Sequence, residues 1–341
     1  MSTKTLQAPP KYNLYEVNSR LRYFKPAIIK KEKTFAQEIS RGLDQKEKSI
    51  SPKYFYDLKG SKLFEKICKL PEYYLTRTET KILKNIGNEL KDFLPKNIRL
   101  VEFGSGSAVK TRMLLDILSS IQNKTEYFPI DISDILEESS KKLLEYYEDL
   151  SITGVIDSYE GGLEFIKVFD DKPNLIAFLG SSFGNFTPEF GFAFLQKLSS
   201  IMKHNDFFFI GLDLVKEKKI LEDAYNDSEG ITSSFNLNVL LRINDELSAD
   251  FDLSKFSHHA IYNEEKQRVE MYLRSMENQT VQIKKAELSL DFQKDELIHT
   301  ENSHKYSISQ IENIMHKAGF KIEKIWQDKI KPYALCLASK N

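Results

Sequence analysis

The chain has 341 residues, which suits one large domain or two ordinary ones. Hydrophobic residues make up 41% of it, and 49 basic side chains balance 50 acidic ones, so the charge gives no reason to expect a nucleic acid as the main partner. The two cysteines, Cys68 and Cys336, lie far apart, and there is no CxxC or paired-histidine motif. The sequence therefore predicts neither a disulfide framework nor a metal site.

The sequence carries no sign of export or of membrane insertion. The N-terminus lacks the hydrophobic region of a signal peptide, and no apolar run approaches the roughly 20 residues needed to span a bilayer. We therefore expect a cytoplasmic monomer with no membrane partner.

The first third of the chain reads as an arm followed by helices. Residues 1–30 contain three prolines and scattered charge without periodicity, which predicts a loosely ordered arm. Helices are expected at 34–43, 61–67 and 78–90, where apolar residues recur at helical spacing. An aromatic loop at 51–57 separates the first two.

From residue 98 the pattern becomes alternating strand and helix. Strands are predicted at 99–103, 127–131, 154–158, 174–179 and 206–214, with helices at 133–147 and 188–202. Strands that alternate with helices imply right-handed crossovers and a mostly parallel sheet. The predicted fold class is therefore α/β.

The alternation stops after residue 215 and resumes near the C-terminus. Two helices (216–225 and 232–243) and three short strands (260–263, 267–274 and 280–283) are expected in between, whereas 297–306 is polar and receives no element. A helix at 308–318, capped by Gly319, and strands at 320–326 and 333–338 then complete the sheet. We expect an N-terminal arm and helix (1–50), an α/β domain (51–215 and 300–341) and an inserted smaller α+β lobe (216–299).

Candidate binding residues follow the strands, because ligands of open α/β sheets bind outside the carboxyl ends of the strands. Gly104 and Gly106 form a Gly-x-Gly turn after the first strand. Asp131 ends the second strand and could accept hydrogen bonds from both hydroxyls of a ribose. Asn185 follows the fourth strand in a glycine-flanked loop. Two plainer interpretations stay open: Asp131 as a helix cap, and Asn185 as a turn residue with positive φ.

The spacing after the glycines separates two kinds of nucleotide site. A dinucleotide fingerprint requires a third glycine at position 109, where this chain has Val109 followed by Lys110. A pyrophosphate is therefore not indicated. A strand end of the form E-x-G-x-G with an acid downstream better fits the nucleoside of S-adenosylmethionine, which has no phosphate.

With these motifs the sequence resembles the histidine-specific methyltransferases of the ergothioneine pathway, which convert L-histidine to its Nα-trimethyl form, hercynine. The segments that carry the resemblance include KYFYD (53–57), LPEYY (70–74), EFGSG (102–106), FLGSSFGN (178–185), VEMYL (269–273) and TENSHKY (300–306). It extends from about Pro52 to the C-terminus. It implies a Rossmann-like S-adenosylmethionine-dependent methyltransferase sheet whose inserted lobe binds the substrate.

The resemblance assigns five residues to S-adenosylmethionine: Gly104, Lys110, Asp131, Ser158 and Tyr159. The first three would hold the methionyl and ribose parts. The family usually has an acid followed by an aromatic residue for the adenine, and Ser158-Tyr159 occupies that place here. Tyr159 can supply a stacking face, but Ser158 departs from the acid, and Asp157 or Glu160 could take its place.

The resemblance also assigns a histidine site: Tyr73, Asn185, Tyr225, Glu301 and Ser303. Asn185 and Tyr225 would bind the carboxylate, and Glu301 and Ser303 the two ring nitrogens, which an acceptor and a donor can read together. Tyr73 would lie beside the amino group, with Tyr56 and Phe64 as walls. Structural interpretations stay open: Glu301 and Ser303 as a surface strand end, Tyr225 and Tyr73 as core aromatics.

The implied chemistry is an in-line displacement of a methyl group from a sulfonium, which depends chiefly on orientation. The amine loses its proton easily because its pKa in solution is near 8, so no strong general base is required. Tyr56 and Tyr73 are the candidate catalytic residues that orient the amine, and aromatic faces suit the final quaternary ammonium. Two alternatives stay open: a methyltransferase for another amino acid or small amine, and a non-catalytic S-adenosylmethionine-binding protein.

Overall fold

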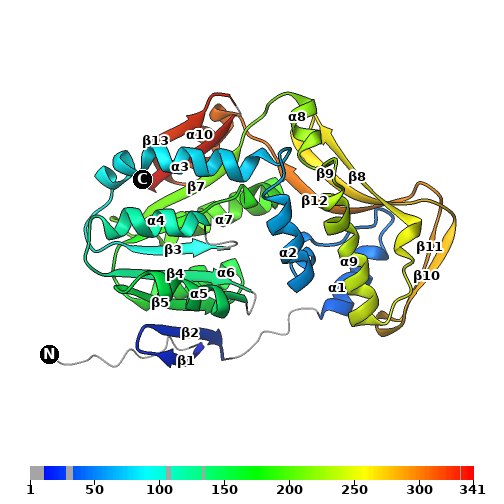
Figure 1. The fold of residues 1–341 in the computed structure, drawn as a ribbon, viewed down its shortest axis with the longest axis horizontal. Coiled ribbons are helices and arrows are strands. Elements are labelled where there is room, and N and C mark those ends of the chain that lie inside the picture. Colours follow the sequence, from blue (N-terminus) through cyan, green and yellow to red (C-terminus); the bar gives the residue numbers. More distant parts are fainter. Residues whose placement is uncertain (1–10, 28–33, 105–108, 133–134, 331) are drawn as a thin grey trace.

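The computed structural model describes residues 11–27, 34–104, 109–132, 135–330 and 332–341. Within them, a sheet of nine strands runs in the order β1-β2-β5-β4-β3-β6-β7-β14-β13 (Figure 1). Its parallel centre consists of β3 (Arg99–Phe103), β4 (Thr125–Asp131), β5 (Leu150–Ile156), β6 (Asn174–Phe178) and β7 (Phe207–Asp213). The hairpin of β13 (Phe320–Asp328) and β14 (Tyr333–Lys340) adds antiparallel to β7. The predicted α/β class is confirmed.

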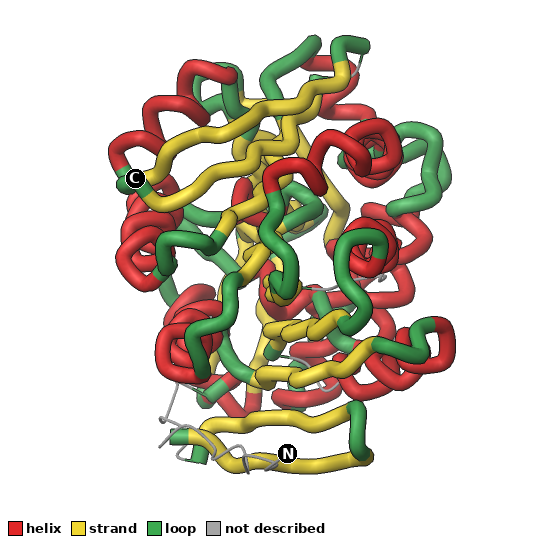
Figure 2. The backbone as a smooth tube through the Cα atoms, turned by 90° about the vertical axis from the view of Figure 1, so that its left-hand side faces the viewer, coloured by secondary structure: helices red, strands yellow, loops and turns green. Residues whose placement is uncertain are grey.

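Helices cover both faces of this sheet, as the edge-on view of Figure 2 shows. One core cluster includes α3 (Tyr74–Phe93), α4 (Val109–Ser119) and α5 (Ile135–Tyr146), and the other includes α6 (Tyr159–Phe169), α7 (Pro188–Ile201) and α10 (Ile308–Lys317). The sequence predicted no helix at α6, because Gly161 and Gly162 lower helix propensity in its first turn. Ser158 caps this helix: its hydroxyl accepts from the backbone N–H of Gly161 at 3.2 Å.

The N-terminal prediction is wrong for residues 12–26. They form a hairpin of β1 (Tyr12–Asn18) and β2 (Leu21–Pro26), and β2 pairs parallel with β5. Leu21, Tyr23 and Phe24 are buried in this edge of the sheet. The apolar residues of β2 are the signal that composition and prolines obscured, while residues 1–10 and 28–30 lie outside the described part.

The second lobe combines segments from three parts of the chain. Its three-stranded sheet has the order β12-β9-β8, formed by β8 (Phe256–Asn263), β9 (Arg268–Ser275) and β12 (Leu297–His304), beside a hairpin of β10 (Gln279–Ile283) and β11 (Leu288–Phe292). The helices α1 (Phe35–Leu43), α2 (Leu58–Ile67), α8 (Lys218–Asp223) and α9 (Ile231–Leu247) lie in the same half of the molecule (Figure 1). Helix α2 packs on α9, so N-terminal residues help to build this lobe.

Several boundaries differ from the sequence-based ones. Helix α3 begins at Tyr74 rather than at 78, and β5 begins at Leu150 rather than at 154. Residues 297–304, which received no element, form β12, so a domain boundary at residue 300 falls inside a strand. The polar residues of β12 hid its strand character, and two of them, Glu301 and Ser303, line a pocket. None of the helices in the described part combines the length and the apolar character that a membrane span requires.

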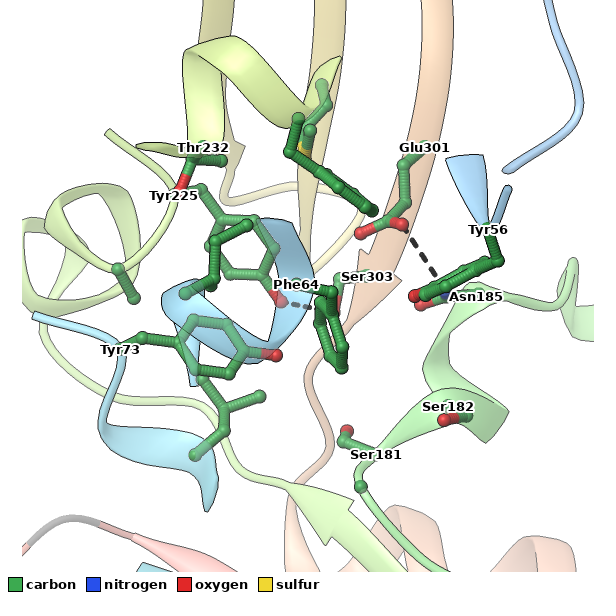
Figure 3. Close-up of a pocket in the computed structure, with 16 residues that line it drawn as sticks. Tyr56, Phe64, Tyr73, Ser181, Ser182, Asn185, Tyr225, Thr232, Glu301 and Ser303 are labelled. Carbon is green, nitrogen blue, oxygen red and sulfur yellow. Dashed lines mark hydrogen bonds between the residues drawn. The ribbon is translucent and has the colours of Figure 1, made fainter. Parts of the chain in front are cut away.

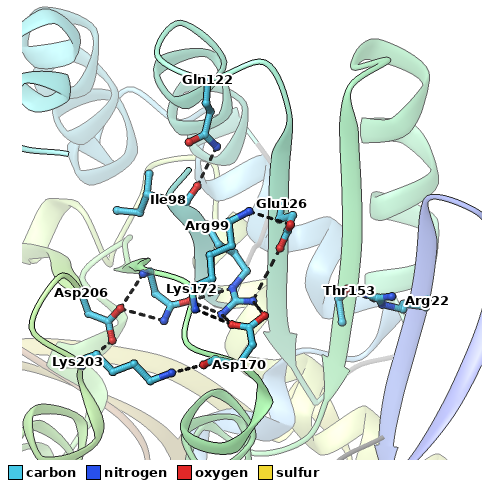
Figure 4. Close-up of polar contacts among 11 residues, drawn as sticks. Arg22, Ile98, Arg99, Gln122, Glu126, Thr153, Asp170, Lys172, Lys203 and Asp206 are labelled. Carbon is cyan, nitrogen blue, oxygen red and sulfur yellow. Dashed lines mark hydrogen bonds and ion pairs between the residues drawn. The ribbon is translucent and has the colours of Figure 1, made fainter. Parts of the chain in front are cut away.

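A polar cluster around buried Arg99 lies at the amino end of the parallel strands (Figure 4). Arg99, at the start of β3, is fully buried and makes two hydrogen bonds of 2.9 and 3.0 Å to Asp170. It also donates to the side-chain oxygen of Asn174, whose own N–H groups bond to Asp206. The guanidinium lies 4.1 Å from the ring centre of Phe128. This cluster ties β3, β4 and β6 together at the end of the sheet opposite the strand ends where ligands bind.

Candidate functional site

The glycine turn after β3 has the backbone that a close ligand contact requires. Gly104 has φ of 67°, and a Cβ there would lie 3.1 Å from the hydroxyl oxygen of Tyr159. Gly106, the second glycine of the predicted turn, lies outside the described residues. Beneath the turn, buried Glu102 accepts hydrogen bonds from Thr111 and Tyr127 at 2.8 and 2.6 Å. Burial raises the pKa of Glu102 to about 7, and its contacts join β3 to α4 and β4.

Lys110 is held at the same edge by an acid that the sequence did not single out. Its ammonium lies 2.7 Å from a carboxylate oxygen of Glu79, which is fully buried on α3. Glu79 also accepts from the backbone N–H of Gly180, after β6, and from the hydroxyl of Tyr333. Lys110 is thereby placed beside the loop that follows β6, between the glycine turn and that loop.

Among the residues expected at the ribose and adenine, Asp131 and Tyr159 interact electrostatically, whereas Asp157 and Ser158 make hydrogen bonds within their own loop. Asp131 ends β4, and burial together with the Asp131 charge raises the pKa of the Tyr159 hydroxyl. Asp157 has structural partners: it accepts from the N–H of Ser158 and from the hydroxyl of Tyr12, both at 2.7 Å. With Ser158 serving as a helix cap, Asp157 and Ser158 both have roles in the loop itself.

A pocket lies where the carboxyl ends of the sheet meet the second lobe (Figure 3). It includes about 510 Å³ of space, part of it open to solvent. All six residues that the sequence analysis placed at the substrate or its amine line it: Tyr56, Tyr73, Asn185, Tyr225, Glu301 and Ser303. They come from the segments before α2 and α3, the turn after β6, the segment after α8, and β12. The structure therefore brings together side chains that are up to 247 residues apart in the chain.

Glu301 is the electrostatically distinctive group of this pocket. Its side chain is buried, and burial raises its pKa to about 7 against the opposing effect of Lys305. Within the described residues, its carboxylate has a single long hydrogen bond, 3.4 Å from the amide nitrogen of Asn185 (Figure 3). A buried carboxylate with so little compensation is an acceptor available to a ligand.

Asn185 lies in a 3₁₀ turn, Ser182–Asn185, after β6. The alternative that it is a turn residue with positive φ is wrong, because Ser181 takes that conformation instead, with φ of 60°.

The opposite side of the pocket carries two hydroxyls in contact. Tyr225 donates to the Ser303 hydroxyl at 2.8 Å (Figure 3). Behind them, Lys305 donates to both oxygens and forms an ion pair with Asp213 at the end of β7. Lys216 pairs with the same aspartate. This network was not predicted from the sequence, although an aspartate that ends the apolar run of β7 is a signal, since a buried charge requires a partner.

Aromatic rings form the remaining wall. Phe64 packs edge-on against both Tyr56 and Tyr73, with ring centres 5.6 and 6.2 Å apart, and Phe235 of α9 lies 5.8 Å from Tyr56. Tyr73 in turn meets the ring of Tyr225 at 6.2 Å. These π faces suit a cationic ammonium group. Phe235 is a pocket residue that the sequence analysis did not identify.

The doubly wound sheet, with a glycine and an acid at its carboxyl edge beside a pocket lined by polar and aromatic side chains, is that of a Rossmann-like methyltransferase fold. The chain belongs to the family described as "Histidine-specific methyltransferase, SAM-dependent", whose model matches residues 35–340.

Three curated relatives illustrate the range of that similarity. The chain is 37% identical to the histidine N-alpha-methyltransferase of Mycolicibacterium smegmatis over 303 residues, which cover 89% of this chain and 94% of the relative. It is 28% identical to ergothioneine biosynthesis protein 1 of Schizosaccharomyces pombe, over 84% of this chain but 38% of that longer protein. It is 26% identical to an L-tryptophan methyltransferase of Psilocybe serbica, over 84% and 87% of the two chains.

Proposed function

We propose that this protein transfers methyl groups from S-adenosylmethionine to the α-amine of L-histidine, up to the trimethylated product hercynine, as the first step of ergothioneine biosynthesis. The observation that carries the proposal is that buried Glu301 and Ser303, both on β12, line the same pocket. Glu301 is an acceptor with one long hydrogen bond, and Ser303 has a hydroxyl proton to donate. A neutral imidazole offers one N–H and one bare nitrogen, which this pair complements.

The cofactor half of the site would lie at the glycine turn. S-adenosylmethionine supplies a methyl group on a positively charged sulfur. Gly104 and Lys110 suit its methionyl part, Asp131 its ribose hydroxyls, and Tyr159 the adenine face. The left-handed backbone of Gly104 next to the Tyr159 hydroxyl supports this assignment, because a side chain at position 104 would crowd the space between them. Ser158 would contribute by capping α6, which presents Tyr159.

The substrate half would orient the amine. Asn185 and Tyr225 supply donors for the carboxylate at one side of the pocket, while Tyr73 and Tyr56 surround the amino group. Burial keeps the pKa of the Tyr73 hydroxyl well above its usual range, so it stays protonated and can position the amine but not act as a strong base. The amine reaches its nucleophilic form by losing a proton near neutral pH, and the rate gain comes from alignment.

The test is an assay of the purified protein with L-histidine and S-adenosylmethionine, followed by mass spectrometry. We expect mono-, di- and trimethylhistidine in succession. A panel with L-tryptophan and simple amines separates the alternative substrates, since an indole cannot offer a bare ring nitrogen to Ser303. A folded protein that binds S-adenosylmethionine but methylates none of these compounds would contradict the proposal and favour a non-catalytic binding role.

The expected monomeric state and cytoplasmic location remain predictions. Light scattering in solution and fractionation of the source cells would check them.

A further inference from the structure

Lys305 is a buried lysine behind the pocket, immediately after β12. Its side chain is fully buried, and its ammonium has three acceptors: a carboxylate oxygen of Asp213 at 2.9 Å, the Ser303 hydroxyl at 2.9 Å and the Tyr225 hydroxyl at 3.1 Å. An ammonium has three protons to donate. The three contacts therefore use its full donor capacity, and two of them end on hydroxyls that line the pocket.

Lys305 keeps its charge despite its burial. Burial by itself would lower the pKa of the ammonium, but the Asp213 carboxylate and the Tyr225 hydroxyl outweigh that effect and raise the pKa above its usual range. A charged lysine is a donor only. The two hydroxyls that face it can consequently only accept from it.

The contacts of Lys305 with Tyr225 and Ser303 determine where each hydroxyl can direct its proton. A hydroxyl has one proton and two acceptor positions. Ser303 accepts from both Lys305 and Tyr225, so its own proton is left to turn into the pocket. Tyr225 accepts from Lys305 and donates its own proton to the Ser303 oxygen, 2.8 Å away. When a ligand is bound, the Tyr225 hydroxyl can rotate and donate that proton to the ligand carboxylate instead.

We propose that Lys305 is a positioning residue that presets the hydroxyls of Tyr225 and Ser303 as hydrogen-bond donors toward an amino-acid substrate. Its effect is on specificity, because Ser303 set as a donor accepts a ring with a bare nitrogen and disfavours a ring that presents N–H or C–H there. The inference rests on the proposed function, since it deepens the assignment of that same pocket.

Lys216 provides a matched control within the same network. It forms an ion pair with the other carboxylate oxygen of Asp213 and donates to the Tyr74 hydroxyl at 2.7 Å. Its side chain is also nearly fully buried, and in the described part of the chain no hydrogen bond joins it to Tyr225 or Ser303. Lys216→Met therefore removes a buried lysine from Asp213 without touching the pocket hydroxyls.

The experiment is a calorimetric titration of L-histidine into the full-length protein saturated with S-adenosylhomocysteine, the demethylated form of the cofactor. Lys305→Met should weaken histidine binding about 10- to 100-fold, as expected for losing charge-assisted hydrogen bonds. Its affinity for S-adenosylmethionine, and both affinities of Lys216→Met, should stay within about threefold of the wild type. Equal losses in the two lysine variants, or unchanged histidine binding in Lys305→Met, would overturn the inference.

A double-mutant cycle distinguishes positioning from a purely structural role. If Lys305 acts through the hydroxyl, Lys305→Met should weaken histidine binding by less than about threefold when Ser303→Ala is already present. Additive losses would contradict the inference. Should Lys305→Met fold poorly, Lys305→Gln keeps a polar side chain beside Asp213 but has no ammonium to serve all three acceptors, and it should show the same loss. If the wild type itself does not bind histidine, the proposed function falls first, and this inference falls with it.

Discussion

The two ends of the parallel sheet each hold an acid near a fully buried cation: partly exposed Asp170 beside Arg99 at the amino end, and buried Glu301 near Lys305 at the carboxyl end. The two acids differ in how far the fold compensates their charge. At the amino end, burial would raise the pKa of Asp170, but two hydrogen bonds from Arg99 lower it below its usual value. At the carboxyl end, burial raises the pKa of Glu301 to about 7, because Lys305 acts on it only at a distance and is bonded to other groups. The first acid is satisfied by the fold, whereas the second is left for a ligand.

These two regions show how a structural polar cluster can be distinguished from a binding site in this molecule. Both contain strongly polar residues that sequence inspection could single out. Of the two acids, Asp170 bonds directly to a guanidinium, whereas Glu301 has one long hydrogen bond to an amide within the described residues. Glu301 also lies at the strand ends where α/β folds bind ligands. The comparison predicts that substitutions at the amino end change stability, and that substitutions at the carboxyl end change binding.

The largest expected effect is on stability, from Arg99→Met. It removes the guanidinium that bonds to partly exposed Asp170 and leaves the buried side-chain oxygen of Asn174 without its donor, and we expect the free energy of unfolding to fall by about 3–4 kcal/mol. Urea denaturation followed by circular dichroism measures it. An exposed pair supplies the control: Lys142→Met, which breaks the ion pair with Glu138 on the surface of α5, should cost less than about 1 kcal/mol. Similar losses in both variants would remove the distinction on which the comparison rests.

The second prediction concerns the pH dependence of stability. The folded-state pKa of Glu301 is raised to about 7, so the unfolded chain ionises this group at a lower pH than the folded protein does. The wild-type free energy of unfolding should therefore decrease as pH rises from about 4.5 to 7. Glu301→Gln lacks this titration. Its stability relative to the wild type should therefore increase across that window by up to about 3 kcal/mol. Denaturation midpoints at pH 5 and pH 8, measured without ligand, test it, and a constant difference would show that Glu301 is not destabilised by burial.

The sequence predicts features that depend on neighbouring residues better than contacts between residues far apart in the chain. The predicted strands of the sheet, including the one that ends just before Gly104, follow from local periodicity, and they are confirmed. The six pocket residues came from a family resemblance, and the structure brings them together. Local pattern could not show that Lys305 reaches Asp213, 92 residues earlier, because that contact depends on how two lobes meet.

The N-terminal hairpin failed for a related reason. Its burial depends on β5, more than 120 residues away, and not on its own composition. Helix α6 failed because two glycines conceal a helix that Ser158 caps and the sheet supports.

The third prediction addresses binding at the carboxyl end. Glu301→Gln keeps the shape of the side chain but replaces one acceptor oxygen with an N–H donor, which would face the N–H of the ring. Histidine affinity should fall about 100-fold, while the affinity for S-adenosylmethionine changes by less than about threefold. Calorimetry with each ligand measures both. A parallel fall in the two affinities would place Glu301 with the structural acids, as Asp170 is.

The smallest expected effect concerns the cofactor half of the site. It tests whether the N-terminal hairpin contributes to the stability of the fold or to the binding of S-adenosylmethionine. The hydroxyl of Tyr12, in the N-terminal hairpin, shares its one proton between Asp157 at 2.7 Å and the carbonyl of Gly161 at 2.9 Å, and so fixes the loop that presents Tyr159. Tyr12→Phe should weaken S-adenosylmethionine binding about threefold to tenfold and leave histidine binding to the cofactor-saturated protein unchanged. Tyr15→Phe, on the exposed side of the same strand, is the control and should be neutral. If Tyr12→Phe lowers only the melting temperature, the hairpin supports the fold as Arg99 does. If it lowers cofactor affinity at unchanged stability, the hairpin is part of the binding site.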